Sequence, residues 1–299
     1  MLPGRTVTPQ RHRSLSTAKR NLVEQLRSSL VSSDARLRSL EDSILDMRIP
    51  EGQPELLSDN YDCEKAQLYF HLYTVPVLEA ARLLTKHRHN LAIQWGAIQL
   101  CLGLHLRYID CVIDGDLPAL DGAELLRRAT GYLAQAHKLL QEGGHAWTPR
   151  QAAVYSQFTE YEREARLGHF HDFNTLWRRV SPIGIVGETY LQSMISAPSF
   201  HSNFRNYLGW TLLHCDCNDV LDDLAAKRQT PVTILVGERM RSATNLSAAA
   251  DVIRTIRRFL SRQAARMLLG IGTHCPLWRH SIRTIQTAFD SGLGAADDR

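Results

Sequence analysis

Apolar residues recur at three- and four-residue spacing along almost the whole chain, and the alternation of apolar and polar residues typical of strands is nearly absent. This is the spacing at which a helix presents a continuous apolar stripe to a core. Clusters of Gly, Pro, His and Asn divide the pattern into separate helices. With 299 residues, 44% of them hydrophobic, the chain can bury one large core. We therefore expect an all-α, single-domain helical bundle around a central cavity, with helices over Ala66–Thr85, Leu91–Ile113, Gly122–Gln141, Pro149–Leu167, Asn174–Ser193, Ser202–Ala225, Ala248–Leu268 and Trp278–Ser291.

The first sixty residues form a separate region. Residues 1–20 are rich in Arg, Ser, Thr and Pro and lack the apolar segment of a secretory signal, which favours a disordered tail over a transit peptide. Leucines at Leu22, Leu26 and Leu30, followed by Leu37 and Leu40, then predict an amphipathic start that packs on the core. We expect residues 1–60 to form a variable, partly disordered arm with one amphipathic helix, and residues 61–299 to form the main domain.

Charge and cysteine content exclude several classes of protein. The net charge of +4 is small for this length and spread along the chain, so we expect no nucleic-acid partner. The six cysteines lack the spacing of a zinc site, and a reducing, cytoplasmic location is the simplest interpretation. No apolar run reaches the length of a membrane span. The sequence leaves a homodimer open.

The first stretch that carries chemistry closes the apolar segment Leu91–Ile113. Asp110 and Asp114 are four residues apart, so a helix presents them one turn apart on the same face. Carboxylate oxygens are the ligands that Mg²⁺ prefers, and such a pair can hold metal at the mouth of a bundle. The alternative is an ordinary acidic helix end that faces solvent.

A second apolar segment ends in the same way. Asn218 and Asp222 are also four residues apart, which points an amide oxygen and a carboxylate to one face. The alternative is a solvated charged face with its own ion pairs. Between the two acidic stretches lies Trp177-Arg178-Arg179-Val180-Ser181, whose guanidinium groups suit phosphate oxygens. The three stretches together favour a site that ionises an allylic diphosphate through divalent metal.

In this order the motifs resemble those of the class I terpene synthases, the microbial cyclases of the α-helical isoprenoid synthase fold. The resemblance extends from about Cys63 to Ser291. The D-D-x-x-D motif of that family falls on Asp110 to Asp114, with Cys111 in place of the second aspartate. The other matches are R-R-x-T/S on Arg178, Arg179 and Ser181, N-D-x-x-S-x-x-x-E on Asn218, Asp219 and Asp222, and the C-terminal W-x-x-S-x-R-Y on Trp278, Ser281 and Arg283.

The resemblance implies a Mg²⁺-dependent cyclase over residues 61–299, a lyase that converts farnesyl or geranylgeranyl diphosphate to a hydrocarbon or alcohol and releases diphosphate. It implies that Arg178 senses the diphosphate and that the helix break at Pro182 lies over the reacting carbons. Three Mg²⁺ ions would be held by Asp110, Asp114, Asn218 and Asp222, and the diphosphate would be bound by Arg178, Lys227, Arg228 and Arg283.

Departures from the family pattern keep two alternatives open. Ala226 stands at the glutamate position of the third motif and Asp222 at its serine position. The resulting N-D-x-x-D is similar to the second motif of the prenyl-chain transferases that condense an allylic diphosphate with isopentenyl diphosphate. In those enzymes, however, Arg-Arg follows the first motif, whereas Leu117-Pro118 follows Asp116 here. A non-catalytic helical interaction protein is the second alternative, and Cys111 and Ala226 are its support.

Overall fold

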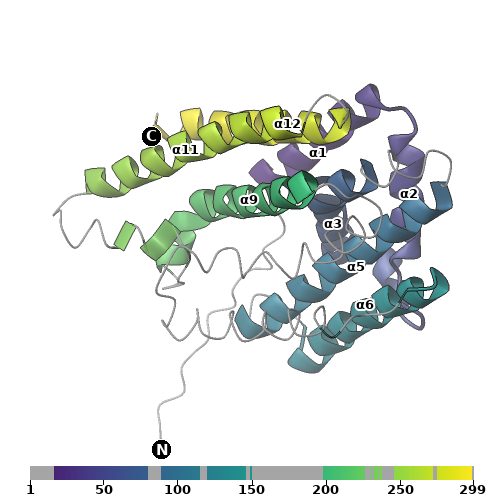
Figure 1. Cartoon of the computed structure of the whole chain (residues 1–299). Helices are drawn as coiled ribbons and strands as arrows, with labels where there is room; N and C mark the ends of the chain where they lie inside the picture. The colour runs from purple at the N-terminus through teal and green to yellow at the C-terminus, as the bar shows by residue number, and fades with distance from the viewer. Residues whose placement is uncertain are drawn as a thin grey trace, which may run out of the picture.

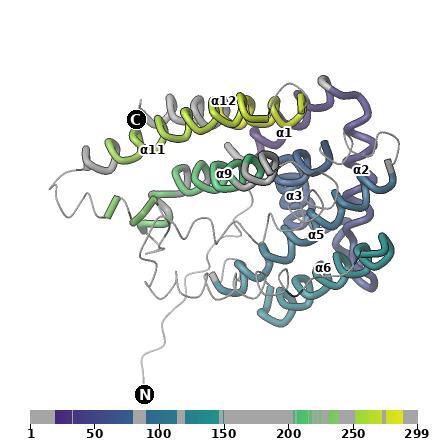
Figure 2. Tube along the Cα trace, in the orientation of Figure 1, coloured from purple at the N-terminus to yellow at the C-terminus, as the bar shows by residue number. Residues whose placement is uncertain are grey.

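The computed structural model describes residues 17–79, 89–114, 120–145, 149, 198–225, 230, 232–234, 236–237, 246–271 and 275–297, and Figure 2 draws the others in grey. Helices and turns account for the regular structure of the described residues, with no strand among them, which confirms the all-α class. The α-helices are α1 Thr17–Ser33, α2 Leu37–Met47, α3 Asn60–Tyr69, α5 His89–Asp114, α6 Gly122–Glu142, α9 Pro198–Ala225, α11 Leu246–Gly270 and α12 Pro276–Asp297, with a 3-10 helix η1 at Pro54–Leu57 and a π-helix η2 at Phe70–Thr74.

The long helices form a bundle in which α11 and α12 lie along one edge, α5 and α6 along the other, and α9 between them (Figure 1). Two contacts show that α5 and α6 are antiparallel. Gln94 Nε2 donates to the carbonyl of Leu139 at 2.8 Å, and His105 Nδ1 lies 2.8 Å from the carbonyl oxygen of Ala129. The C-terminal end of α5 therefore adjoins the start of α6.

Aspartate caps set the starts of α3 and α6. The side chain of Asp59 accepts a hydrogen bond from the backbone N–H of Asp62 at 2.9 Å, and Asp121 does the same for Glu124 at 2.6 Å. Such caps satisfy donors that a first helical turn leaves unpaired. The cap at Asp59 explains why α3 begins at Asn60, before the predicted start at Ala66.

The helix that begins with α3 widens into the π-helix η2. The backbone N–H of Val75 bonds to the carbonyl of Phe70, five residues earlier, and residues 75–79 continue as helix. Pro76 follows directly, and proline has no N–H and crowds the carbonyl four residues before it. A wider turn ahead of Pro76 accommodates both effects without ending the helix.

The N-terminal region contains two helices, α1 and α2, where one was expected. The break follows from Asp34, whose side chain accepts from the backbone N–H of Arg36 at 2.9 Å, a local bond that competes with helix continuation. Both helices bury their apolar faces in the common core, as the leucine spacing predicts. The buried residues are Leu22, Leu26, Leu30, Leu37, Leu40 and Ile44.

A buried carboxylate fixes α3 against the helix that carries the candidate site. Asp62 is fully buried and accepts hydrogen bonds from Tyr132 at 2.7 Å, from Tyr108 at 2.9 Å and from Arg48 at 2.9 Å. Its donors come from the end of α2, from α5 and from α6. Removal of one partner from such a network costs more than a surface hydrogen bond, because a buried charge loses its compensation. The start of α3 is thereby held beside the end of α5.

Among the described residues, one helix is long and apolar enough to cross a membrane by length and composition alone, which differs from the sequence expectation. It covers Asn90–Ile113, and about two thirds of its most apolar window is buried inside the protein. This helix is α5, which packs against α2, α3 and α6. Because α5 is largely buried among other helices, its apolar composition is that of a core helix.

Candidate active site

The candidate site begins where α5 emerges from the core. Leu104 and Tyr108 are almost fully buried, and the side chain of Asp110 is 18% exposed. The buried helix α5 thus carries a partly exposed carboxylate in its last turns.

A short chain of hydrogen bonds orients this carboxylate. Arg107 Nη1 donates to Asp110 Oδ2, and Arg107 Nε donates to Tyr61 Oη at 2.9 Å. Burial raises the pKa of Tyr61, so its phenol keeps its proton at neutral pH. Among the described residues none donates a hydrogen bond to the other oxygen of Asp110, Oδ1. Within the described part of the chain the carboxylate is therefore held through one oxygen, and the second oxygen accepts no hydrogen bond there.

The position of Cys111 gives a physical account of the departure from D-D-x-x-D. Cys111 is fully buried, and its Sγ lies 3.2 Å from Tyr61 Oη, where either atom can be the donor. Consecutive residues of a helix point about 100° apart, so Cys111 and Asp110 face different ways. Cys111 therefore belongs to the packing between α3 and α5. A side chain at position 111 therefore does not share the face of Asp110.

Helix α9 carries the predicted stretch from Asn218 to Asp222. The side chains of Asn218, Asp219 and Asp222 fall outside the described set, as does that of Asp114 at the end of α5. Two other aspartates of α9, Asp216 and Asp223, are each 7% exposed and so are buried, and both take part in interactions. Asp216 and Asp223 were not among the metal ligands predicted from the sequence, which were Asn218 and Asp222 on this helix.

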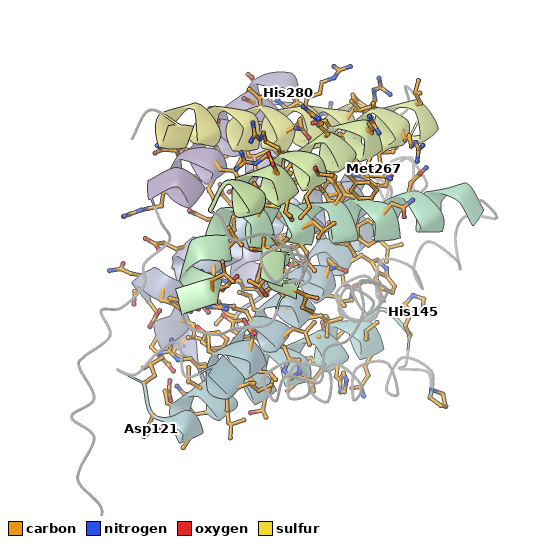
Figure 3. The ribbon with its side chains drawn as sticks, turned by 90° about the vertical axis from the view of Figure 1, so that its left-hand side faces the viewer. Asp121, His145, Met267 and His280 are labelled. Carbon is orange, nitrogen blue, oxygen red and sulfur yellow. The ribbon has the colours of Figure 1, made fainter. Side chains whose placement is uncertain are left out.

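The two acidic helix ends lie at the same end of the bundle. In Figure 1 the C-terminal ends of α5 and α9 both point to the left-hand side, and Figure 3 views the molecule from that side. The fold thus brings Asp110 and the Asn218 region to one end of the molecule, as a shared site requires. Arg178, Pro182, Lys227 and Arg228 lie outside the described residues, as do the predicted helix Asn174–Ser193 and, apart from Pro149, the predicted helix Pro149–Leu167.

Arg283 is not brought to the end of α5. It is exposed on α12, three residues after His280. Figure 3 shows His280 at the edge of the molecule opposite Asp121, which begins α6 shortly after α5 ends. Helix α12, which carries Arg283, thus lies along the edge of the bundle opposite α5 (Figure 1).

Asp110 offers one oxygen ligand of the type that Mg²⁺ prefers. The described residues contain no group of three or more His, Cys, Asp or Glu side chains close enough to hold a metal. The Asp110 carboxylate is partly exposed, and among the described residues only Arg107 donates to it, through one of its two oxygens. The further ligands would come from Asp114, Asn218 and Asp222, the residues named by the motifs.

Five large aromatic side chains that are candidates to line a substrate cavity pack in the core. Trp210 Nε1 donates to the carbonyl of Leu260 at 3.0 Å, and the rings of Tyr207 and Trp278 meet edge to face with centroids 5.7 Å apart. Each of the five candidates is at most 4% exposed: Phe70, Tyr73, Trp95, Trp210 and Trp278.

Sequence reasoning missed Tyr61 and Arg107. Arg107 had a signal, because it lies three residues before Asp110, a spacing at which helical side chains pair. Tyr61 had none, since only the packing of α3 on α5 brings it there.

Comparison of the chain with protein-family models, with curated proteins and with solved structures gave no match.

Proposed function

We propose that the protein is a Mg²⁺-dependent terpene cyclase that ionises and cyclises farnesyl or geranylgeranyl diphosphate. The observation that carries the proposal is the carboxylate of Asp110, which is partly exposed and held through one oxygen by Arg107. It lies at the same end of the bundle as the end of α9. The order of the four motifs along the chain adds support that is independent of this geometry.

Each proposed role follows from the charge of a diphosphate leaving group. Bound Mg²⁺ would neutralise that charge and so favour departure of the diphosphate at neutral pH. Asp110, with Asp114, Asn218 and Asp222, would supply the oxygen ligands. Arg107 and Tyr61 would position Asp110, so that its free oxygen faces the ligand rather than rotating toward solvent.

Guanidinium and ammonium groups would hold the diphosphate itself. Arg178 is proposed to donate through a planar fork, with Lys227, Arg228 and Arg283 as further donors. For Arg283 this role requires that it reach the site from α12, since it is exposed at the other edge of the described bundle. Apolar side chains around the prenyl chain would exclude water from the allylic cation.

A second function, prenyl-chain transfer to isopentenyl diphosphate, is favoured by one observation. Asp222 stands where the cyclase motif has serine, and the resulting Asn218-Asp219-x-x-Asp222 is similar to a motif of the chain-elongating enzymes. The absence of Arg-Arg after Asp116 counts against it, so cyclisation is the first choice.

One experiment separates these functions. The purified chain is incubated with geranyl, farnesyl and geranylgeranyl diphosphates, each with and without isopentenyl diphosphate, in Mg²⁺ or in EDTA. We expect cyclic volatile products from a single prenyl diphosphate, in Mg²⁺ only. Longer linear diphosphates that form only with isopentenyl diphosphate would establish the transferase instead. No turnover of any substrate would favour a non-catalytic protein.

A further inference from the structure

A row of exposed arginines runs along α11, contrary to the even spread of charge expected from the small net charge. Arg254, Arg258, Arg262 and Arg266 occur every four residues, and all are exposed. At about 1.5 Å per residue the row is about 18 Å long. The opposite face of the helix is buried in the core through Ile256, Leu260, Ala264 and Met267.

The arginine row has almost no compensating charge. Arg254 pairs with Asp251 at 2.6 Å, but no Asp or Glu occurs in the sequence from Val252 to Phe289. Among the described residues none forms an ion pair with Arg258, Arg262 or Arg266. Like charges one helical turn apart repel one another. An arrangement of this kind is stabilised when an anionic partner covers it.

Two large apolar side chains interrupt the same exposed face. Leu269 is 83% exposed and Phe259 is 41% exposed, whereas the neighbouring Leu260 and Met267 are buried. At about 100° per residue, Leu269 projects in a direction between those of Arg258 and Arg262. Single exposed apolar side chains are common on protein surfaces, but both of these lie on the face of α11 that carries the arginines. The face thus combines fixed positive charge with apolar groups that project from it.

We propose that this face of α11, defined by Arg254, Arg258, Phe259, Arg262, Arg266 and Leu269, docks on the surface of an anionic lipid bilayer. A guanidinium group forms paired hydrogen bonds with a lipid phosphate, and each basic residue adds to attraction by the negative surface potential. Leu269 and Phe259 would enter the boundary between headgroups and acyl chains, as the apolar residues of interfacial helices do. A soluble polyanion would pair with the arginines but offer Leu269 nothing, and for this reason a bilayer fits better. The proposal is independent of the catalytic one.

Flotation of the full chain with lipid vesicles tests the proposal. The vesicles contain phosphatidylcholine alone or phosphatidylcholine with phosphatidylglycerol, each at low and high salt. We expect binding to the anionic vesicles only, and weaker binding at high salt. The double variant Arg258→Gln, Arg262→Gln should lower vesicle affinity about 25-fold, because the loss of each charge lowers it about fivefold. The matched control is Arg36→Gln with Arg38→Gln, two exposed arginines of the α2 region that change net charge equally, and it should bind as the unaltered chain does.

The variant Leu269→Asn distinguishes a bilayer from a soluble polyanion. It leaves the charge unchanged, so it should weaken vesicle binding several-fold and leave retention on heparin unaltered. Far-ultraviolet circular dichroism verifies that each variant is folded. Three results would overturn the proposal: no flotation of the unaltered chain, equal loss in the α11 and control variants, or vesicle binding that does not change in Leu269→Asn. The last result, with retention on heparin, would point to a nucleic acid or an acidic protein.

Discussion

The carboxylate of Glu79 caps α12 at Trp278, whose backbone N–H donates to Glu79 Oε2 at 2.7 Å. The other oxygen, Oε1, accepts from the N–H of Leu277 at 2.8 Å, and Glu79 is buried. A carboxylate at this position satisfies two donors that the first turn leaves open and interacts favourably with the helix dipole. The start of the helix that bears Trp278, Ser281 and Arg283 thus depends on a residue from the other half of the chain.

Loss of this cap should destabilise the fold. We expect Glu79→Ala to lower the free energy of unfolding by about 2 kcal/mol, because it leaves buried N–H groups without acceptors. Glu79→Gln retains one acceptor and should cost less. Urea denaturation measures both. Glu51→Ala is the matched control, since Glu51 is 85% exposed in an ion pair with Lys138 and should cost less than about 0.5 kcal/mol. Equal costs at the two positions would refute the capping role.

Helix positions could be predicted from the sequence because helical spacing is a local property. The expected Gly122–Gln141 differs from α6 by one residue at its end, and Leu91–Ile113 lies within α5 with one to two residues to spare. The Glu79 cap could not be predicted, because its partners are 198 and 199 residues away. Asp110 was predictable for the same local reason as its helix, whereas the contact between Tyr61 and Arg107 depends on how α3 packs on α5.

A substitution at Cys111 tests whether a carboxylate at this position would bind metal. Because Cys111 is buried against Tyr61, Cys111→Asp would place a carboxylate in the core and should cost at least about 2 kcal/mol in the free energy of unfolding, with no gain in turnover. Cys111→Ala removes only a small thiol and should retain Mg²⁺-dependent turnover. Denaturation and product formation are measured on both. Higher turnover or tighter Mg²⁺ binding in Cys111→Asp would show that position 111 reaches the metal.

His214 predicts a loss of stability in acid. Burial lowers its pKa to about 4, an effect that a hydrogen bond with Gln286 opposes and the charge of Arg257 reinforces. An unfolded histidine has a pKa of about 6.5, so between about pH 6.5 and 4 the unfolded chain binds a proton that the folded protein does not. Stability therefore falls as the pH falls through this window, by on the order of 3 kcal/mol in total.

The variant His214→Gln isolates this contribution. Glutamine can form hydrogen bonds but takes up no proton, so the variant should lose much of the acid dependence. The pKa values of His105 and His137 are also lowered by burial, and they account for part of the slope that remains. Denaturation at a series of pH values measures the slope. An unchanged slope in His214→Gln would mean that His214 is not buried in its neutral form.

Arg178 and Arg179 offer a comparison of guanidinium with ammonium. A lysine carries the same charge but cannot reproduce a planar fork, so Arg178→Lys should lower turnover by at least about tenfold. Arg179 points about 100° away on a helix and should tolerate the same change. Steady-state kinetics on the active prenyl diphosphate compare the two. Equal tolerance would mean that neither side chain binds the diphosphate.

Turnover of farnesyl or geranylgeranyl diphosphate by Asp110→Ala tests the central claim most directly. The matched control is Asp251→Ala, because Asp251 and Arg254 also form an aspartate–arginine pair three residues apart, but one that is exposed on α11. Both variants should stay folded. We predict that Asp110→Ala loses at least about 100-fold in Mg²⁺-dependent turnover, because the leaving group loses several kcal/mol of charge stabilisation, and that Asp251→Ala retains full turnover. Product formation by Asp110→Ala at the rate of the unaltered chain would contradict the metal assignment and the function built on it.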